Sequence, residues 1–479
     1  MTTPPTTPWT TADILAATNG ALVCGDPRQG FDGISIDSRR IIPGQLFVAI
    51  VGQKHDGHRF IEEALRCGVQ GVVVGSAAVR TLPWHRWRQK GIVVAAVDDT
   101  ARALGDLAAF HRRRHGVPVV AITGSNGKTS TKDMTAAVLG RRPPILATMG
   151  NLNNEIGVPL TLLRLAGHER WAVIELGMNH AGEIARLTDI CAPRVGIITN
   201  IGPAHLEALR SVEGVRDAKG ELLGRLPSGA TAILNADDAW SMQLARQTAR
   251  PVVRFGRSPE VQIGARDVTL RNLTIRFTLT TPQGDIPIRL PTPGAFMVSN
   301  ALAAAAVGDL AGMSLEEIKA GLEDFRPASG RLTIFQTARG VNVIDDSYNA
   351  NPASMQAAIG TLAALSAGGR AIWVAGEMRE LGPQAAAMHR DVGELAARSG
   401  IAKIYATGPH AREIARGARS AGMHDGDIVT GSRQEIADGL SGRTRPGDWI
   451  LIKGSRAAGM EVIADALRNG EDPPQGTEK

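Results

Sequence analysis

The stretch VPVVAITGSNGKTSTKDMTAAVLG, residues 117–140, decides how this chain folds. Its first seven residues are rich in β-branched side chains, which is typical of a buried strand, and its last thirteen have the composition of a helix. The segment GSNG therefore lies at a strand-to-helix turn. A strict phosphate-binding loop has a glycine five residues before its Gly-Lys pair, and here that position holds Ile122. The turn is thus a phosphate-loop candidate that departs from the standard pattern.

This turn still offers what a phosphate cradle requires. Gly124 and Gly127 allow tight backbone angles, successive N–H groups can converge on phosphate oxygens, and the helix N-terminus adds positive charge. Lys128 would then reach the β- and γ-phosphates of a nucleotide, and the Thr129 hydroxyl would ligate Mg²⁺. The predicted nucleotide-binding residues of the loop are Gly124, Ser125, Asn126, Gly127, Lys128, Thr129 and Ser130. From the tetrapeptide alone, a glycine-rich helix start with a surface lysine stays open as the alternative.

Outside the loop, short apolar runs alternate with helical patterns along nearly the whole chain, which predicts an α/β protein with largely parallel sheets. The length of 479 residues predicts several domains. We expect an N-terminal α/β domain over residues 1–98, a central P-loop NTPase-like parallel sheet over 99–327, and a C-terminal Rossmann-like domain over 328–479. Residues 261–294 alternate with period two, which predicts a small antiparallel appendage on the central domain.

The composition argues against several classes of function. The net charge is +6 with dispersed basic residues, and aromatic residues make up 4%, so nucleic-acid binding is not expected. The densest basic run, residues 111–115, is predicted to be a solvated helix end. No apolar run is long enough to span a membrane and no signal peptide is recognised, so we expect a cytoplasmic protein. Cys24, Cys67 and Cys191 lack metal or redox spacing and are predicted to be buried, inert thiols.

Two further residues lie where a nucleotide site would need them. Glu175 ends the strand-like run WAVIEL, and His205 follows the run VGIITNI. Both are expected at the carboxyl edge of a parallel sheet, where ligands bind, and both are therefore predicted to serve Mg²⁺. A structural role remains the alternative for either residue taken singly. Lys219, in RDAKGELL, reads from its position alone as a solvated helical lysine.

The motifs TGSNGKTS, GNLNNEIGVPLTLL, ELGMNHAGEI, NIGPAHLEAL, DAKGEL and LNADD, in this order and spacing, resemble the Mur ligase family of peptidoglycan synthesis. The run ISIDSRRIIPGQLFVAIVGQKHDGHRF resembles the uridine-nucleotide domain of that family, and IDDSYNANPASMQAAI and LIKGSRAAGMEVI resemble its C-terminal domain. The family uses a shortened phosphate loop, so the resemblance implies a nucleotide site. IDDSYNANP and GNLNNEIG are most similar to the members that add D-alanyl-D-alanine.

The resemblance implies an ATP- and Mg²⁺-dependent ligase. It would join the terminal carboxylate of UDP-N-acetylmuramoyl-tripeptide to the amine of D-alanyl-D-alanine through an acyl phosphate. Lys128 and Thr129 would bind the phosphates and a first Mg²⁺ shared with Glu175, and His205 would help to hold a second Mg²⁺. Lys219 matches the family lysine that is carbamylated, which would turn a cation into a carboxylate-like group. The enzyme is expected to be a monomer.

Other roles follow from the resemblance alone. Asn300 would lie near the adenine, Asp346 would contact the ribose, and Arg331 would face the phosphates. Further residues are assigned to the nucleotide (Asn349 and Asn351), to the substrate (Ser38, Arg39 and Asn154) and to a C-terminal motif (Lys453, Ser455 and Arg456). Where the family usually has Gly-x-His-Asn, this chain has Phe296-Met297, so the contacts on that side of the adenine are in doubt.

Three alternatives stay open at this point. An amino-acid-adding member of the family would act on the dipeptide precursor. A P-loop kinase or GTPase would explain the loop but would leave the C-terminal motifs without a role. A nucleotide-binding scaffold would bind ATP without substrate-dependent turnover. The motifs do not decide whether the third residue of the accepted peptide is diaminopimelate or lysine. Since the predicted site draws on two domains, we expect the crevice to close about a hinge near residues 327–330.

Overall fold

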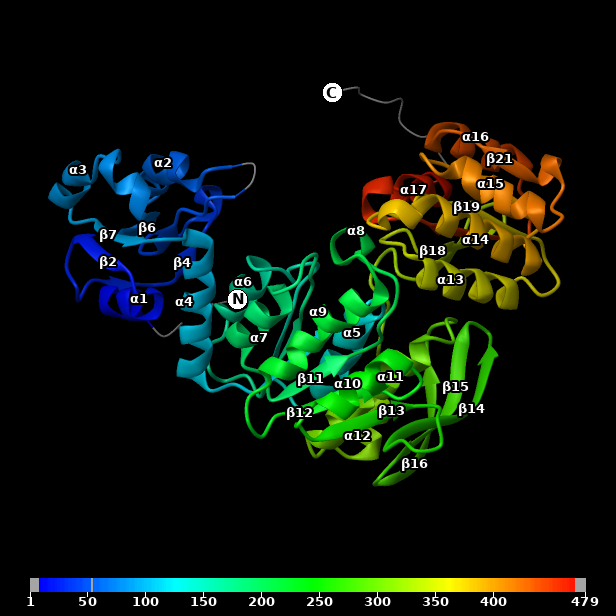
Figure 1. Ribbon diagram of the computed structural model, residues 1–479, viewed down its shortest axis with the longest axis horizontal. Helices are drawn as coiled ribbons and strands as arrows, with labels where there is room; N and C mark the ends of the chain where they lie inside the picture. The colour runs from blue at the N-terminus through cyan, green and yellow to red at the C-terminus, as the bar shows by residue number, and fades with distance from the viewer. Residues whose placement is uncertain (1–7, 53–54, 470–479) are drawn as a thin grey trace.

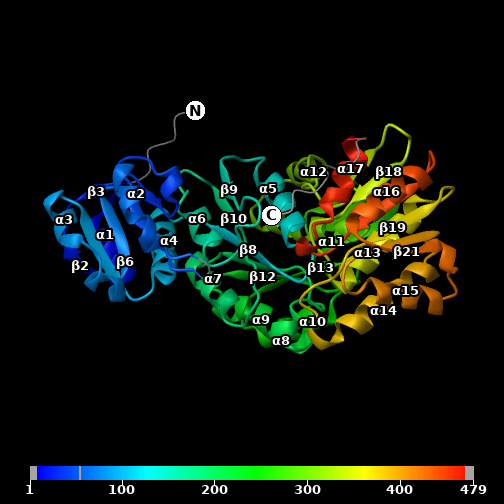
Figure 2. The same ribbon diagram turned by 90° about the horizontal axis from the view of Figure 1, so that it is seen from above.

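A computed structural model of the chain describes residues 8–52 and 55–469. Three α/β domains lie in a row, each built on its own sheet (Figure 1). The N-terminal and C-terminal domains lie at opposite ends of the molecule, with the central domain between them, and the perpendicular view shows the same arrangement (Figure 2). The predicted class, three domains with mainly parallel sheets, is confirmed. No described helix is both long and apolar enough to cross a membrane.

The N-terminal domain has a five-stranded sheet in the order β2-β7-β6-β5-β4, in which only β2 is antiparallel to its neighbour. A separate antiparallel pair joins β1 to β3. The strands are β1 (Trp9–Thr10), β2 (Ala21–Cys24), β3 (Gly30–Phe31), β4 (Ile34–Ser35), β5 (Leu46–Val48), β6 (Gly71–Gly75) and β7 (Val93–Val97). The helices are α1 (Thr11–Thr18), η1 (Ser38–Arg40), η2 (Gly57–Phe60), α2 (Ile61–Arg66), η3 (Ser76–Arg80), α3 (Trp84–Gln89) and α4 (Thr100–His115).

The central domain has a nine-stranded sheet in the order β16-β15-β14-β13-β12-β11-β8-β10-β9. Its strands are β8 (Val119–Thr123), β9 (Ile145–Ala147), β10 (Trp171–Glu175), β11 (Val195–Ile198), β12 (Thr231–Asn235), β13 (Val252–Gly256), β14 (Ile263–Arg271), β15 (Thr274–Thr281) and β16 (Gly284–Leu290). Its helices are α5 (Lys128–Leu139), α6 (Gly157–Leu162), α7 (Glu183–Cys191), α8 (Leu206–Leu209), α9 (Val212–Arg225), α10 (Ala239–Gln247), α11 (Met297–Leu310) and α12 (Leu315–Glu323). The predicted antiparallel appendage is β14–β16, and it continues the main sheet because β13 pairs with β14.

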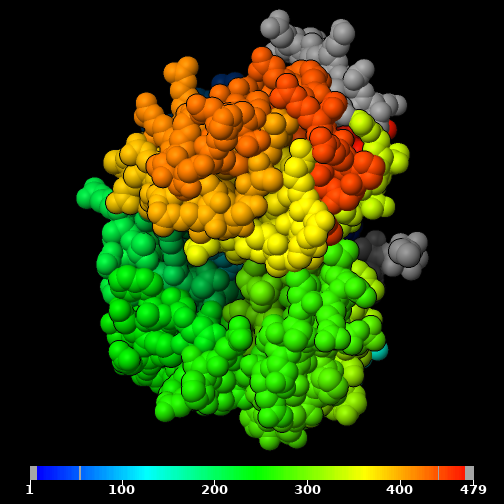
Figure 3. Space-filling model, turned by 90° about the vertical axis from the view of Figure 1, so that its right-hand side faces the viewer, coloured from blue at the N-terminus to red at the C-terminus, as the bar shows by residue number. Residues whose placement is uncertain are grey.

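The C-terminal domain has a six-stranded sheet in the order β17-β18-β22-β19-β20-β21, parallel except for β17. Its strands are β17 (Thr333–Gln336), β18 (Asn342–Asp345), β19 (Ala371–Ala375), β20 (Lys403–Ala406), β21 (Ile428–Thr430) and β22 (Trp449–Lys453). Its helices are α13 (Pro352–Leu365), η4 (Gly382–Gln384), α14 (Ala385–Arg398), α15 (Ala411–Ser420), η5 (Asp425–Asp427), α16 (Arg433–Arg443), η6 (Arg456–Ala458) and α17 (Glu461–Asn469). Seen from its right-hand side, this domain sits directly on the central one (Figure 3).

Two expectations about individual residues were wrong. The helix end at residues 111–115 is not simply solvated, because His111 is buried and stacks on Trp9 with ring centroids 5.3 Å apart, while Arg112 donates a hydrogen bond to the Ala192 carbonyl. This end of α4 therefore joins the first two domains. Among the cysteines, Cys67 is exposed, because it follows a short surface helix and its side chain faces solvent.

Candidate active site

The phosphate-loop candidate joins β8, an inner strand of the central sheet, to α5. Gly127 has φ +80°, and a Cβ added to it would lie 2.3 Å from the Asn300 Oδ1 atom. Gly124 has φ +149°, and its added Cβ would lie 1.8 Å from the Thr199 Oγ1 atom. Both positions therefore require glycine, because the backbone angles and the lack of space each exclude a side chain.

Hydrogen bonds from the end of β11 hold this loop in shape. The Ser125 N–H donates to the Asn200 carbonyl at 2.9 Å, and the Asn126 N–H donates to the Asn200 side-chain oxygen at 3.0 Å. The Thr199 hydroxyl donates to the Asn126 carbonyl at 2.6 Å, and the Ser125 hydroxyl to the Gly202 carbonyl at 3.0 Å. Thr199 and Asn200 were missed by the sequence reasoning, because the pairing of β8 with β11 is what brings them to the loop.

Lys128 begins α5, and its ammonium group donates to the Gly124 carbonyl at 2.7 Å. Burial lowers the pKa of Lys128, while the carboxylate of Glu175 acts in the opposite direction. Two C-terminal residues also act on the Lys128 pKa: Arg331 lowers it and Glu380 raises it. Lys128 is thus the point where charges from both domains meet.

Glu175 ends β10, next to β8, and its side chain is 2% exposed. Its Oε1 atom accepts a hydrogen bond from the Asn153 amide at 2.8 Å, whereas its Oε2 atom is buried with no hydrogen-bond partner within the described part of the chain. A buried carboxylate oxygen without a partner is costly and suits a bound cation. Thr129 and Ser130 are buried in the first turn of α5.

The described residues contain no group of three His, Cys, Asp or Glu side chains that could hold a metal ion by themselves. Mg²⁺ is commonly bound through one or two carboxylates together with water and substrate phosphates, so a single carboxylate beside a phosphate loop fits that ion.

His205 and Lys219 come from the segment after β11. His205 has φ +55°, and its Nδ1 atom lies 2.6 Å from the Glu380 Oε2 atom of the C-terminal domain, although the ring N–H is not aligned for a hydrogen bond. Lys219 lies in α9 and is 1% exposed, contrary to its expectation as a solvated lysine. Burial lowers the pKa of the Lys219 amine well below its ordinary 10.5, and nearby Lys128 lowers it further.

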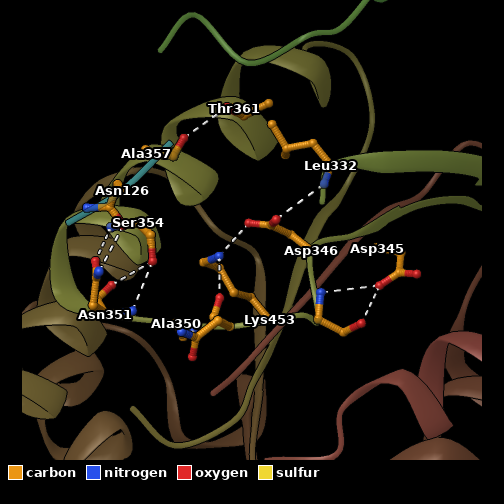
Figure 4. Close-up of polar contacts among 12 residues, drawn as sticks. Asn126, Leu332, Asp345, Asp346, Ala350, Asn351, Ser354, Ala357, Thr361 and Lys453 are labelled. Carbon is orange, nitrogen blue, oxygen red and sulfur yellow. Dashed lines mark hydrogen bonds and ion pairs between the residues drawn. The ribbon is translucent and has the colours of Figure 1, made fainter. Parts of the chain in front are cut away.

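A second polar cluster lies at the carboxyl edge of the C-terminal sheet (Figure 4). The Lys453 ammonium contacts the Asp346 carboxylate at 2.5 Å and donates to the Asn349 carbonyl at 2.9 Å. The other Asp346 oxygen accepts from the Leu332 N–H at 3.2 Å. Burial raises the pKa of Asp346, while the charges of Lys453 and Arg331 act against that rise.

This cluster touches the phosphate loop directly. The Asn351 amide donates to the Asn126 side-chain oxygen at 2.8 Å, and Asn351 also caps the N-terminus of α13 (Figure 4). The Arg331 guanidinium lies 4.1 Å from the Tyr348 ring centroid, with that of Arg456 at 5.6 Å. The structure therefore brings together the loop and the C-terminal residues that the sequence assigned to one nucleotide.

Other predicted residues lie elsewhere or serve local contacts. Ser38 is buried and donates to Glu63 at 2.9 Å, and the exposed Arg39 pairs with Asp37 at 2.9 Å. The Asn154 side-chain oxygen accepts hydrogen bonds from the N–H groups of Ile156 at 3.2 Å and Gly157 at 2.8 Å, just before and at the start of α6. Their roles toward a substrate stay predictions. Two further placements complete the set: the Ser455 hydroxyl is buried without a hydrogen-bond partner among the described residues, and the Asn349 side-chain oxygen accepts from the Arg456 N–H at 3.4 Å.

Phe296 and Met297 differ in their exposure to solvent. Phe296 is exposed, whereas Met297 is buried and accepts a weak hydrogen bond from the Asn300 amide at its sulfur, 3.3 Å away. Asn300 is thereby held against Gly127, at the loop itself.

Family models match all three domains: "Mur ligase family, catalytic domain" over residues 30–112, "Mur ligase middle domain" over 122–308, and "Mur ligase, glutamate ligase domain" over 330–456. A UDP-N-acetylmuramoyl-tripeptide--D-alanyl-D-alanine ligase of Escherichia coli (strain K12) is 39% identical over 442 residues, which are 91% of this chain and 94% of that protein. The chain belongs to the Mur ligase family.

Solved structures of Mur ligases agree with this assignment. The crystal structure of MurF from Acinetobacter baumannii matches with a TM-score of 0.87 at 33% identity, covering 97% of this chain and 99% of that one. MurF ligase from Thermotoga maritima, solved in complex with ADP, matches with a TM-score of 0.81 at 26% identity, covering 91% and 96%. The resemblance drawn from the motifs is confirmed, and it extends over all three domains.

Proposed function

We propose that this chain is the ATP- and Mg²⁺-dependent ligase that joins D-alanyl-D-alanine to UDP-N-acetylmuramoyl-tripeptide, acting as a monomer in the cytoplasm. One observation carries the proposal: a relative named for this reaction aligns with 91% of the chain at 39% identity. The geometry supports it, because the phosphate loop faces a polar cluster from a second domain, as a reaction between bound partners requires.

The reaction proceeds in two steps. A carboxylate oxygen of the tripeptide attacks the γ-phosphorus of ATP, ADP leaves, and an acyl phosphate forms. The amine of D-alanyl-D-alanine then attacks the acyl carbon, loses a proton, and phosphate departs with the former carboxylate oxygen. The enzyme contributes mainly by positioning the reactants and neutralising their charge.

The nucleotide phosphates would lie at the N-terminus of α5, on backbone N–H groups of the loop other than those of Ser125 and Asn126, which already donate to Asn200. Lys128 would exchange its contact with the Gly124 carbonyl for a phosphate oxygen, and Arg331 would add positive charge from the C-terminal domain. The rest of the nucleotide would be surrounded by Asn300, Asp346, Asn349 and Asn351.

Mg²⁺, when bound, supplies positive charge that offsets the charge developing on the transferred phosphoryl group. Thr129 and Glu175 are the residues that would hold it. The Thr129 hydroxyl lies in the first turn of α5, and the Oε2 atom of Glu175 is buried without a hydrogen-bond partner among the described residues. His205 and carbamylated Lys219 would serve a second ion. A buried amine beside Lys128, with a lowered pKa, favours the neutral form that reacts with CO₂.

In this proposal residues 1–98 bind the uridine nucleotide through Ser38 and Arg39, residues 99–327 bind ATP, and residues 328–479 complete the nucleotide site. Asn154 faces the tripeptide. A hinge at residues 327–330 lets the domains close, and Gly330, with φ +70°, has the backbone freedom for it.

The test is phosphate release from ATP and Mg²⁺ with UDP-N-acetylmuramoyl-tripeptide, with and without D-alanyl-D-alanine. A parallel reaction offers the dipeptide precursor with a single amino acid. Release that requires the tripeptide and D-alanyl-D-alanine together supports the proposal. Release only with the dipeptide precursor would assign the chain to an amino-acid-adding ligase, and no stimulation by either pair would favour a nucleotide-binding scaffold. The mass of one extra CO₂ on the peptide that contains Lys219 tests the carbamate.

A further inference from the structure

A pair of side chains meets across the boundary between the central and C-terminal domains. The Nδ1 atom of His205, just before α8, lies 2.6 Å from the Oε2 atom of Glu380, in the segment between β19 and η4. A backbone contact accompanies it, since the Glu207 N–H donates to the Glu380 carbonyl at 3.0 Å. Gly382 packs against the same segment, since a Cβ added to it would make an ordinary van der Waals contact, 3.4 Å from the Glu207 Cα atom. The two domains therefore contact each other here through both side chains and backbone.

The segment that presents Glu380 is held firmly within its own domain. The Met378 N–H donates to the His389 Nε2 atom at 2.8 Å, and the other ring nitrogen of His389 donates to the Ala385 carbonyl at 2.6 Å. Met378 and Leu381 are each 2% exposed, so the segment is anchored on both sides of Glu380. A carboxylate on an anchored segment can orient a partner, whereas one on a mobile loop cannot.

Backbone conformation reinforces this reading. Glu380 has φ +64° and His205 has φ +55°, so two non-glycine residues in the left-handed region face each other across the boundary. Such conformations are uncommon in residues other than glycine and tend to occur at functional sites. An ordinary surface ion pair, which contributes little, would need neither of them.

We propose that Glu380 is a positioning residue, delivered by the C-terminal domain, whose carboxylate accepts a hydrogen bond from the Nδ1–H group of His205 and so leaves the Nε2 lone pair free for the site. Ligating histidines usually donate their second ring nitrogen to a carboxylate in this way. Rotation of the ring about its soft χ2 torsion would align the contact. The inference rests on the proposed function, and it makes the arrangement of His205 depend on closure of the crevice.

The test compares four proteins: wild type, Glu380→Ala, Glu380→Asp and Glu207→Gln. Glu207 is the matched control, because its exposed carboxylate lies at the same boundary while only its backbone N–H contacts Glu380. Steady-state kinetics would give kcat and KM for each substrate. Histidine labelled with ¹⁵N would report the tautomer of His205 in the presence of ADP and Mg²⁺, with the resonance assigned by its loss in His205→Asn.

Loss of such a carboxylate partner typically costs 10- to 100-fold. We expect Glu380→Ala to lower kcat by about that factor, with KM for the tripeptide substrate unchanged, and to shift His205 away from the Nδ1-protonated tautomer. Glu380→Asp should recover part of both losses, and Glu207→Gln should match wild type. A Glu380→Ala protein with wild-type kcat and an unchanged His205 tautomer would overturn the inference. The two proposals fail separately, because a wild-type protein without substrate-dependent turnover would contradict the proposed function, whereas the tautomer can still be read.

Discussion

Replacing Lys219 by methionine should make the protein more stable and inactive at the same time. Lys219 is 1% exposed, and no ion pair or hydrogen bond of its amine is found among the residues that the structure describes. Besides burial, the positive charge of Lys128 lowers the pKa of the Lys219 amine. A charged ammonium in this position costs stability, and methionine has almost the same length without the charge.

The size of this effect follows from the linkage between pKa and folding. Because the pKa of Lys219 is lowered in the folded state, the unfolded chain binds more protons, and wild-type stability rises with pH toward the ordinary lysine pKa of 10.5. The advantage of Lys219→Met is therefore largest at low pH and shrinks by about 1.4 kcal/mol for each pH unit above the folded-state pKa. At neutral pH we expect an advantage of about 1–4 kcal/mol, by analogy with the range seen when buried ion pairs are replaced by apolar residues of similar volume.

Thermal unfolding in bicarbonate-free buffer without nucleotide, at several pH values, measures this advantage. For a domain of about 150–250 residues, such as the central domain that contains Lys219, each kcal/mol in stability corresponds to about 2–4 °C in Tm. Lys219→Ala is the control, because it removes the charge but leaves a cavity, and it should be less stable than Lys219→Met by about 2–5 kcal/mol. The reasoning about a buried amine without a charged partner is refuted if the Tm of Lys219→Met is lower than that of wild type at neutral pH. It is also refuted if the difference in Tm does not change with pH.

Three other substitutions test the crevice. Gly127→Ala places a side chain at φ +80° where space is lacking, so ADP binding measured by calorimetry should weaken at least about tenfold; binding within twofold of wild type would contradict the cradle. Asn351→Ser keeps the cap of α13 but cannot reach Asn126, so kcat/KM for ATP should fall by about two- to tenfold, equivalent to one hydrogen bond, with Tm unchanged. Asn153→Leu leaves Glu175 without its amide donor, so the Mg²⁺ concentration for half-maximal activity should rise, and an unchanged requirement would show that the contact does not matter.

Much of the fold could be predicted from local pattern. The β-branched runs that became β8, β10, β11 and β12 were recognisable because strands buried on both faces read as continuous apolar segments. Shorter elements were harder. The segment around Ser38 forms the three-residue 3-10 turn η1, capped by the Asp37 side chain, which is too short to leave a periodic pattern in the sequence. The antiparallel strands were recognised, but their union with the main sheet depends on the pairing of β13 with β14, which no local pattern reveals.

Site residues that belong to a sequence motif could be predicted, whereas residues that reach the site only through tertiary contacts could not. The phosphate loop, Glu175 and His205 could be read from their places at strand ends. Asn153, whose amide donates to Glu175, was not singled out in the sequence, because only the backbone path shows that this asparagine faces the carboxylate. Glu380 could not be found at all, because its partner lies in another domain.

The burial of Lys219 shows the same limit in another form. A lysine in a polar helical segment is ordinarily solvated, and nothing in its immediate neighbours indicates otherwise. Its burial results from the packing of α9 against α7, α8, α10 and β11, which the local sequence does not reveal. Family resemblance pointed to this residue, and the structure supplies the physical reason why its amine is unusual.

The measurement that tests the central claim most directly is the fate of the carboxylate oxygen. UDP-N-acetylmuramoyl-tripeptide carrying oxygen-18 in its terminal carboxylate would be incubated with ATP, Mg²⁺ and D-alanyl-D-alanine, and the released phosphate analysed by mass spectrometry. If ligation passes through an acyl phosphate, each phosphate carries one oxygen from the labelled carboxylate. Amide product accompanied by unlabelled phosphate would contradict the account, because ATP hydrolysis would then be separate from activation of the carboxylate.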